Sequence, residues 1–274
     1  MNFIRDNQEL TDEIKKIPYQ ERSIAIIQNV CSCVFGMPVW RSEFKALSYI
    51  PEETKGLYFY LGSDIKDLLR QIAKLDLANN IEYLTIGTTN FHKYNTPLDY
   101  AEISKVLSNS SFPNLRFFEY GIDEVSYNGH SLYGNLGNIT CALENMPKLE
   151  KLYLFGNFEL SKSLKFNNLS TFEILMNNWV TNINGGRISN NTIQNLLSSN
   201  FSELSLLSLN LDFNDEIFEY SLPEIFLTGR NIQKLKHLEI EGNFVQGSKV
   251  KISQSKFLNE SIERINIEEL KEPR

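Results

Sequence analysis

The sequence predicts an α/β solenoid, a right-handed βα superhelix with a curved parallel sheet on its concave face and helices on its convex face. Two observations lead to this fold class. A nine-residue pattern, LxxLxLxxN, fills residues 149–157 and recurs 86 residues later (235 − 149) at residues 235–243. Stretches with apolar residues at helical spacing lie between shorter copies of the pattern. Such a unit cannot bury its apolar face alone, so its copies must stack on one another.

Residues 1–50 do not follow the pattern, and we expect them to form a helical N-terminal cap. Apolar residues recur at helical spacing within residues 8–17 and 20–33, and residues 37–41 are expected to form a turn or a short strand. A cap would cover the apolar edge that the first unit exposes. Residues 51–274 would then form one continuous domain of about seven to eight units.

The predicted array begins at residues 57–61, where aromatic and aliphatic residues adjoin as in many strands. The pattern then starts at residues 81, 115, 149, 169, 204, 235 and 262, and each copy predicts a further strand. The differences between these positions are 34, 34, 20, 35, 31 and 27 residues. The longer steps leave room for a helix after the strand, whereas the 20-residue step predicts an irregular link.

Helices are predicted on the return from one strand to the next. Residues 96–99 combine a capping threonine, a proline in the first turn and an acid three residues after the cap, a pattern that indicates a helix start. Another helix is expected near residues 217–226, interrupted by Pro223. The predicted apolar stripes are Leu98, Ile103, Val106 and Leu107; Leu136, Ile139, Leu143 and Met146; and Ile193, Leu196 and Leu197.

The pattern LxxLxLxxN is the signature of a leucine-rich repeat, and the long strand–helix units resemble the ribonuclease-inhibitor-like branch of these proteins. The phrases at residues 112–115 and 146–149, the short unit at Leu169 and the loop with Gly185 and Gly186 also resemble an uncharacterised family of bacterial cytoplasmic leucine-rich repeat proteins. The resemblance implies the solenoid fold over residues 55–270. It implies no catalytic or binding residue. This chain departs from the usual repeat at Asp212, where asparagine is expected.

Composition limits the classes of partner. The chain has 274 residues and a formal net charge of −7, which disfavours nucleic acid because phosphate binding needs a concentrated basic surface. It has no apolar run of membrane-spanning length, and its first residues are too polar for a signal peptide. Three cysteines give no disulfide framework, and we expect them to be buried or inert. We therefore expect a cytoplasmic monomer with neither a nucleic-acid nor a membrane partner.

Residues that flank the leucines of each strand should lie on the concave face, because strand side chains alternate in direction. In the first half of the array these residues are mainly aromatic, and contiguous exposed aromatics indicate an interaction site. Acids at positions 119, 173, 239, 241 and 268 outnumber Lys151 and Arg264 (2 − 5 = −3). Trp179, in a polar loop, could anchor a partner or fold over the sheet edge. The predicted partner-binding residues are Tyr58, Tyr60, Tyr83, Phe117, Glu119, Lys151, Tyr153, Phe155, Glu173, Trp179, His237, Glu239 and Glu241.

These features predict a non-catalytic module that binds a protein partner, a basic one, on an aromatic and acidic concave face. The competing interpretation is that the aromatics stack on one another for stability. A narrower alternative is an inhibitor or immunity protein that blocks a toxin or nuclease. A second alternative is an enzyme with an unrecognised site. His92, His130 and His237 fall in different units without an adjacent nucleophile, and no phosphate-binding loop is present, so we expect no cofactor or metal.

Overall fold

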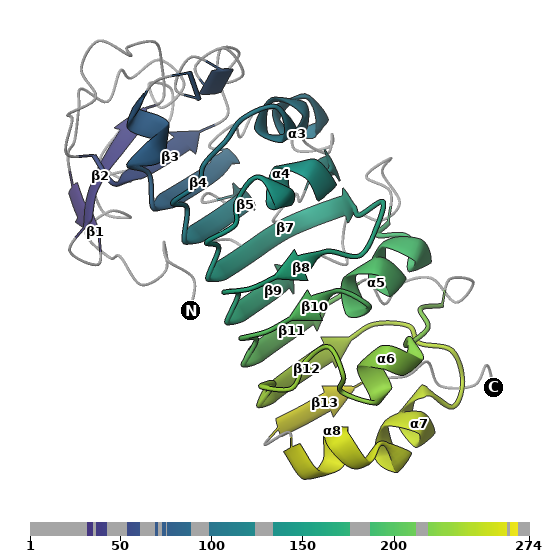
Figure 1. The fold of residues 1–274 in the computed structure, drawn as a ribbon. Coiled ribbons are helices and arrows are strands. Elements are labelled where there is room, and N and C mark those ends of the chain that lie inside the picture. Colours follow the sequence, from purple (N-terminus) through teal and green to yellow (C-terminus); the bar gives the residue numbers. More distant parts are fainter. Residues whose placement is uncertain are drawn as a thin grey trace.

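The computed structural model describes residues 32–34, 37–42, 54–60, 69–70, 73–74, 76–88, 99–123, 134–175, 187–211, 219–261 and 264–267. In this part of the chain a long sheet is built from strands that follow one another in sequence order (Figure 1). All neighbours from β2 (Met37–Ser42) to β13 (Arg264–Ile267) pair in parallel. β1 (Ser32–Val34) pairs with β2 in the antiparallel direction. The predicted α/β class with a long parallel sheet is confirmed.

The strands lie where the repeated pattern predicts them. From β4 to β13, each strand of the main sheet begins two residues after the first leucine or isoleucine of its pattern copy. The pairing aligns the copies, so that Leu152 of one strand lies between Phe118 and Phe172 of its neighbours. The remaining strands are β3 (Gly56–Tyr60), β4 (Tyr83–Thr88), β5 (Phe117–Asp123), β7 (Lys151–Glu159), β9 (Thr171–Leu175), β11 (Leu206–Asn210) and β12 (His237–Glu241).

The connections between these strands contain short helices and strands, and the labelled helices from α3 to α8 lie along one side of the main sheet (Figure 1). No described helix is long and apolar enough to cross a membrane. The helices and short strands of the connections are η2 (Asp76–Asn79), α3 (Ala101–Ser108), β6 (Gly134–Asn138), α4 (Thr140–Glu144), β8 (Lys165–Phe166), α5 (Asn190–Leu197), β10 (Asn200–Phe201), α6 (Glu224–Leu227), α7 (Ser248–Gln254) and α8 (Lys256–Ser261).

The hydrophobic core lies between the main sheet and these connections. It joins the inward residues of the strands to the apolar stripes of the helices, as predicted for Ile103, Val106 and Leu107 of α3. The Tyr120 hydroxyl of β5 donates to the Tyr100 carbonyl oxygen (3.0 Å) and lies 2.8 Å from the Ser104 hydroxyl oxygen. Burial raises the pKa of Tyr120, so the hydroxyl stays protonated and ties α3 to the sheet.

Several connecting elements differ from the prediction. Leu136 lies in β6 and not in a helix, because β6 pairs with the second half of β7, where Gly134 aligns with Gly156. The helix predicted from residues 96–99 begins at Ala101, whose N–H donates to the Asp99 carboxylate (3.0 Å); residues 96–98 lie outside the described part. The 20-residue step forms a link, as predicted. Among its described residues this link contains the short strand β8 and no helix.

Two further predictions are only partly covered by the described residues. α6 begins directly after Pro223, consistent with the interruption predicted there, and residues 217–218 lie outside the description. In the N-terminal region, the short strand predicted at residues 37–41 is β2. The preceding helix was expected to reach Cys33, but Ser32–Val34 is a strand because it pairs with β2. The helices expected over residues 8–17 and 20–31 fall outside the described residues, and the cap stays a prediction.

One backbone arrangement recurs where the strands begin. The carbonyl oxygen of Glu82 accepts hydrogen bonds from two consecutive N–H groups of the next unit, those of Arg116 (2.8 Å) and Phe117 (3.0 Å). The carbonyls of Lys55, Arg116, Glu150, Ser170 and Ser205 do the same, and so each of these units fixes the start of the next strand. We call the residues in this position the edge row. They are Lys55, Glu82, Arg116, Glu150, Ser170, Ser205 and Lys236.

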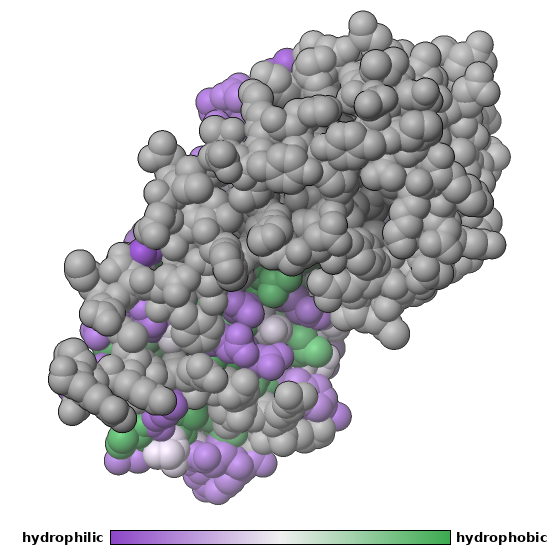
Figure 2. Space-filling model, turned by 180° about the vertical axis from the view of Figure 1, so that it is seen from behind, coloured by the Kyte–Doolittle hydropathy of each residue, from purple (hydrophilic) through white to green (hydrophobic). Residues whose placement is uncertain are grey.

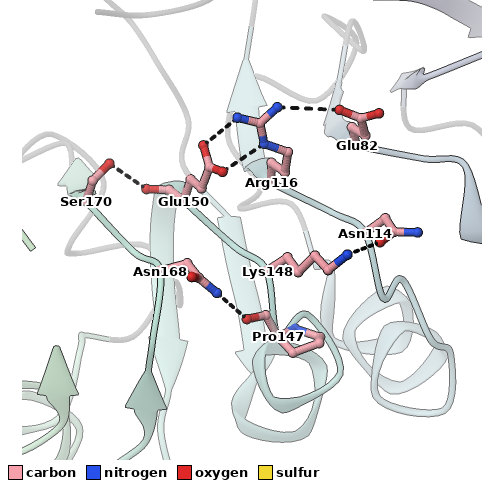
Figure 3. A network of polar contacts seen from close by, with 8 residues as sticks. All are labelled: Glu82, Asn114, Arg116, Pro147, Lys148, Glu150, Asn168 and Ser170. Carbon is pink, nitrogen blue, oxygen red and sulfur yellow. Dashed lines mark hydrogen bonds and ion pairs between the residues drawn. The ribbon is translucent and has the colours of Figure 1, made fainter. Parts of the chain in front are cut away.

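The side chains of the edge row also connect the units, in a network of alternating charge (Figure 3). Arg116 forms two hydrogen bonds with the Glu150 carboxylate (2.8 and 3.0 Å), and its guanidinium also lies 3.5 Å from Glu82. The hydrogen bonds with Glu150 raise the pKa of Arg116. Lys55 contacts Glu82 from the other side (3.4 Å). Because these groups are partly exposed, each ion pair contributes less than about 1 kcal/mol to the free energy of unfolding.

We predict that two glycines with the same backbone angle differ sharply in their tolerance of a side chain. Gly121 and Gly247 both have φ of +87°. A Cβ at Gly121 would lie 2.2 Å from the Phe155 carbonyl oxygen, whereas a Cβ at Gly247 meets nothing within 4 Å. We expect Gly247→Ala to cost about 1 kcal/mol, from backbone strain alone. Gly121→Ala should cost more than about 3 kcal/mol, because two strands must also separate.

Urea-induced unfolding of the two variants measures this difference. Gly247→Ala is the matched control, since it changes the same residue type at the same φ. Equal losses of unfolding free energy in the two variants would contradict the close approach of β5 and β7.

Candidate functional site

The side chains that point away from the core form three rows across the main sheet, and together we call them the row face. Their alignment follows from the register of the parallel strands. The first row is Tyr83, Phe117, Lys151, Thr171, Leu206 and His237; the second is Tyr58, Thr85, Glu119, Tyr153, Glu173, Ser208 and Glu239; the third includes Phe155, Leu175, Asn210 and Glu241.

Four of the predicted aromatics in the N-terminal half of the row face are buried, which corrects the prediction that they are exposed. Tyr58, Tyr83 and Glu119 have exposed fractions of 0%, 1% and 1%. Tyr153 and Phe155 are also buried, although none of the four aromatics belongs to the main core cluster. Alternation along a strand therefore gave the correct direction of these side chains but not their exposure.

Contacts between neighbouring strands explain part of this burial. The rings of Tyr83 and Phe117 are 6.2 Å apart in a tilted arrangement. The Lys151 ammonium lies 5.3 Å from the centre of the Phe117 ring, where a cation is attracted to the face of the ring. Phe117 and Lys151 remain partly exposed. The competing interpretation, in which the aromatics pack for stability, therefore fits this half of the row face better than an exposed binding site does.

Glu119 is a buried carboxylate in the middle of this region. It accepts hydrogen bonds from the hydroxyl of Tyr83 (2.7 Å) and from the hydroxyl of Thr85 (3.0 Å), and these two hydroxyls also contact each other. A buried carboxylate without such donors would cost several kcal/mol, on the order expected for an uncompensated charge. Glu119 is thus held by two residues of the neighbouring strand β4, Tyr83 of the first row and Thr85 of the second row.

The C-terminal half of the row face is more accessible. The outward residues of β9, β11 and β12 are partly exposed, and His237 is exposed. They include three carboxylates, those of Glu173, Glu239 and Glu241, and neither a lysine nor an arginine. We call this surface the acidic patch. Its nine residues are Thr171, Glu173, Leu175, Leu206, Ser208, Asn210, His237, Glu239 and Glu241.

The strand spacing places the three carboxylates of the acidic patch close together. Glu173 and Glu239 lie in the second row with Ser208 between them, a separation of about 10 Å for strands about 4.8 Å apart. Glu239 and Glu241 are two residues apart on one strand, or about 7 Å. The Asn210 amide donates to Glu241 (3.0 Å) and limits the positions of that carboxylate. Lys151 aligns with Thr171 on one side of the patch and Arg264 aligns with His237 on the other, so the three carboxylates lie between two basic positions.

The sequence alone did not single out all the residues of this patch. Leu206, Ser208 and Asn210 complete the surface, but they carry neither a charge nor a ring that would mark them. Alternation along the strand already places them on this face, and their register with Glu173 and Glu239 makes them part of the same surface. Two of the predicted binding residues lie outside the description, Trp179 entirely and Tyr60 by its side chain. His92 and His130, which were considered for catalysis, also lie outside the described residues.

Groups for metal or thiol chemistry are sparse in the described part of the chain. No cluster of three histidine, cysteine or acidic residues there could hold a metal ion. Cys141, which was expected to be buried or inert, is exposed on α4. Its side chain points away from the core, because α4 buries the neighbouring residues Ala142 and Leu143.

The comparisons with known proteins support the fold and nothing finer. The structure is similar to the crystal structure of a protein from Bacteroides fragilis, with a TM-score of 0.53 and 17% sequence identity. The match covers 76% of this chain and 58% of that protein, so this chain corresponds to little more than half of its length. No protein-family profile matches the sequence. No curated protein matches it either.

We predict that Tyr83 and Glu119 stabilise the protein as a pair. Tyr83→Phe removes one donor to the buried carboxylate and should lower the free energy of unfolding by about 1–3 kcal/mol. Glu119→Gln removes the charge but keeps the shape. In a double-mutant cycle measured by urea unfolding, we expect a coupling energy of about 1–2 kcal/mol.

Glu173→Gln serves as the control partner for Tyr83→Phe, because Glu173 is in the same row as Glu119 but two strands farther on. The effects of that pair should add. Additive effects for Tyr83 and Glu119 as well would show that their hydrogen bond contributes nothing to stability.

Proposed function

We propose that this chain is a leucine-rich repeat protein that binds a protein partner through the acidic patch and performs no catalytic step of its own. The observation that carries the proposal is the gathering of Glu173, Glu239 and Glu241 on the accessible half of the row face, without a lysine or arginine among the nine residues. The proposal has two parts, the repeat architecture and the binding surface.

The repeat architecture is supported by the register of the main sheet. Equivalent positions of successive pattern copies lie side by side, as Leu207 does with Phe172 and Leu238. Asn243, the last residue of one pattern copy, is buried, whereas Asn157, its counterpart in the other copy, is partly buried. A curved solenoid with its sheet on the concave side would place the row face inside the curve.

The binding surface differs from the one predicted from the sequence. Tyr153 and Phe155 are buried, so they are poor candidates for the aromatic anchors proposed for this face. The acidic patch instead combines carboxylates with a partly exposed leucine in each of two strands, Leu175 and Leu206. Figure 2, a view from behind, shows hydrophilic surface interrupted by apolar side chains in the C-terminal part of the molecule.

A partner of matching chemistry is a protein with a basic surface. Lysine and arginine side chains would be attracted by the three carboxylates, and apolar groups could contact the leucines between them. An inhibitor or immunity protein that blocks a basic toxin or nuclease is a narrower form of the same proposal, and the negative patch favours it. It would require that the captured partner be toxic or nucleolytic.

We predict that reversing charges in the acidic patch abolishes capture of this partner. The experiment is a pull-down of basic proteins from the host lysate with the tagged chain and with Glu173→Lys/Glu239→Lys. We expect one stoichiometric basic protein on the wild-type chain, with binding that weakens as salt rises. The variant should lose it by a factor of about ten or more, because the surface then repels basic groups.

A matched control carries the same change of charge elsewhere. Glu144→Lys/Glu159→Lys alters two exposed acids near α4 and the end of β7, outside the acidic patch. Loss of the partner in both double variants would indicate a response to net charge alone. Capture that persists in the patch variant would remove the acidic patch as the binding surface.

A further inference from the structure

A groove opens at the C-terminal end of the array, on the helical side and away from the row face. It lies between α6 and the pair α7 and α8, the last helices of the described chain (Figure 1). Its volume is about 460 Å³, within the range of ligand and peptide-anchor pockets. It is lined by Glu224, Leu227, Thr228, Lys251, Gln254, Ser255, Lys256 and Phe257.

The walls of this groove offer apolar contact. Leu227 and the partly buried ring of Phe257 belong to its lining. The same helices carry two large apolar side chains exposed to solvent outside the groove lining, Ile225 of α6 (39% exposed) and Val250 of α7 (54% exposed). These are the large hydrophobic residues that stand exposed among the described residues, and both belong to helices that line the groove. An apolar surface of this kind commonly marks an interaction site.

The charge around the groove is opposite to that of the acidic patch. Residues 242–258 contain three lysines and no acidic residue, although the chain as a whole carries a net charge of −7. Among the described residues that line the groove, Lys251 and Lys256 are basic and Glu224 is acidic. Lys256 lies 4.0 Å from Glu260, the outer limit of an ion pair, and both side chains are largely exposed. The Lys256 ammonium is therefore exposed to a ligand at the rim of the groove.

We propose that this groove binds an acidic segment of a partner protein, with a large apolar side chain of that segment seated against Leu227 and Phe257. Lys251 and Lys256 attract the acidic residues on either side of the anchor. The combination of an apolar floor and a basic rim selects a segment in which acidic and large apolar residues alternate. A basic segment would be repelled by the same rim.

The test uses a short fluorescent peptide in which leucines stand between aspartates, and measures its binding to the intact chain by fluorescence anisotropy at low salt. We expect Lys251→Glu/Lys256→Glu to weaken binding about tenfold or more, because the rim then opposes the peptide charge. Ile225→Ser/Val250→Ser should weaken it by a smaller factor. Lys165→Glu/Lys234→Glu carries the same charge change at exposed lysines outside the groove and should leave binding unchanged.

Two altered peptides separate the contributions of charge and apolar contact. Asparagine in place of aspartate, or serine in place of leucine, should each reduce binding. Failure of the parent peptide to bind, equal binding by the serine peptide, or equal loss in the Lys165/Lys234 control would overturn the proposal. So would a wild-type dimer, measured by sedimentation, that Lys251→Glu/Lys256→Glu dissociates, because the occupant would then be a second copy of this chain.

The variant Glu173→Lys/Glu239→Lys makes this result independent of the function proposed for the acidic patch. It should bind the peptide as the wild-type chain does, since these residues are on the row face and not in the groove. Its far-UV circular dichroism, with that of the groove variants, shows whether each variant is folded.

Discussion

From β3 to β11, the carbonyl oxygen that precedes each strand of the main sheet accepts two N–H groups from the following unit, and much of the structure depends on this arrangement. A unit holds a single strand of the main sheet, so its backbone hydrogen bonds can be completed only by its neighbours. The repeated acceptor sets the start of each strand, and the register then aligns the inward leucines and the outward rows together. Core and surface are therefore positioned by the same backbone contacts.

One row of this surface shows how environment determines the role of a residue type. Glu119 and Glu173 occupy equivalent positions in the second row. Glu119 is buried and holds two hydroxyl donors, so it acts in the cohesion of the fold. Glu173 is partly exposed and lies diagonally across from Lys151 of the neighbouring strand, so its carboxylate reaches solvent. The difference divides the row face into a structural half and an accessible half.

The order and position of the strands could be predicted from the sequence, because leucines at fixed spacing must all be buried by the same sheet. Connecting segments were harder, since Leu136 fits a helical stripe as well as the strand that pairs with β7. Exposure on the row face could not be predicted, because alternation says which way Tyr83 points and nothing of what surrounds it. The groove between α6 and α8 combines residues 30 or so positions apart, and no local pattern marks it.

The alternating charges of the edge row restrict how such a chain could gain or lose units in evolution. Lys55, Glu82, Arg116 and Glu150 follow one another as base, acid, base and acid, with each contacting its neighbours. Deleting the unit that carries Arg116 would bring Glu82 beside Glu150, two carboxylates without the guanidinium that now lies between them. Deleting two adjacent units would restore the alternation. In this part of the array, gain or loss of two units at once is therefore electrostatically easier than gain or loss of one. Ser170 and Ser205 carry no charge, so the units that contain them are not restricted in this way.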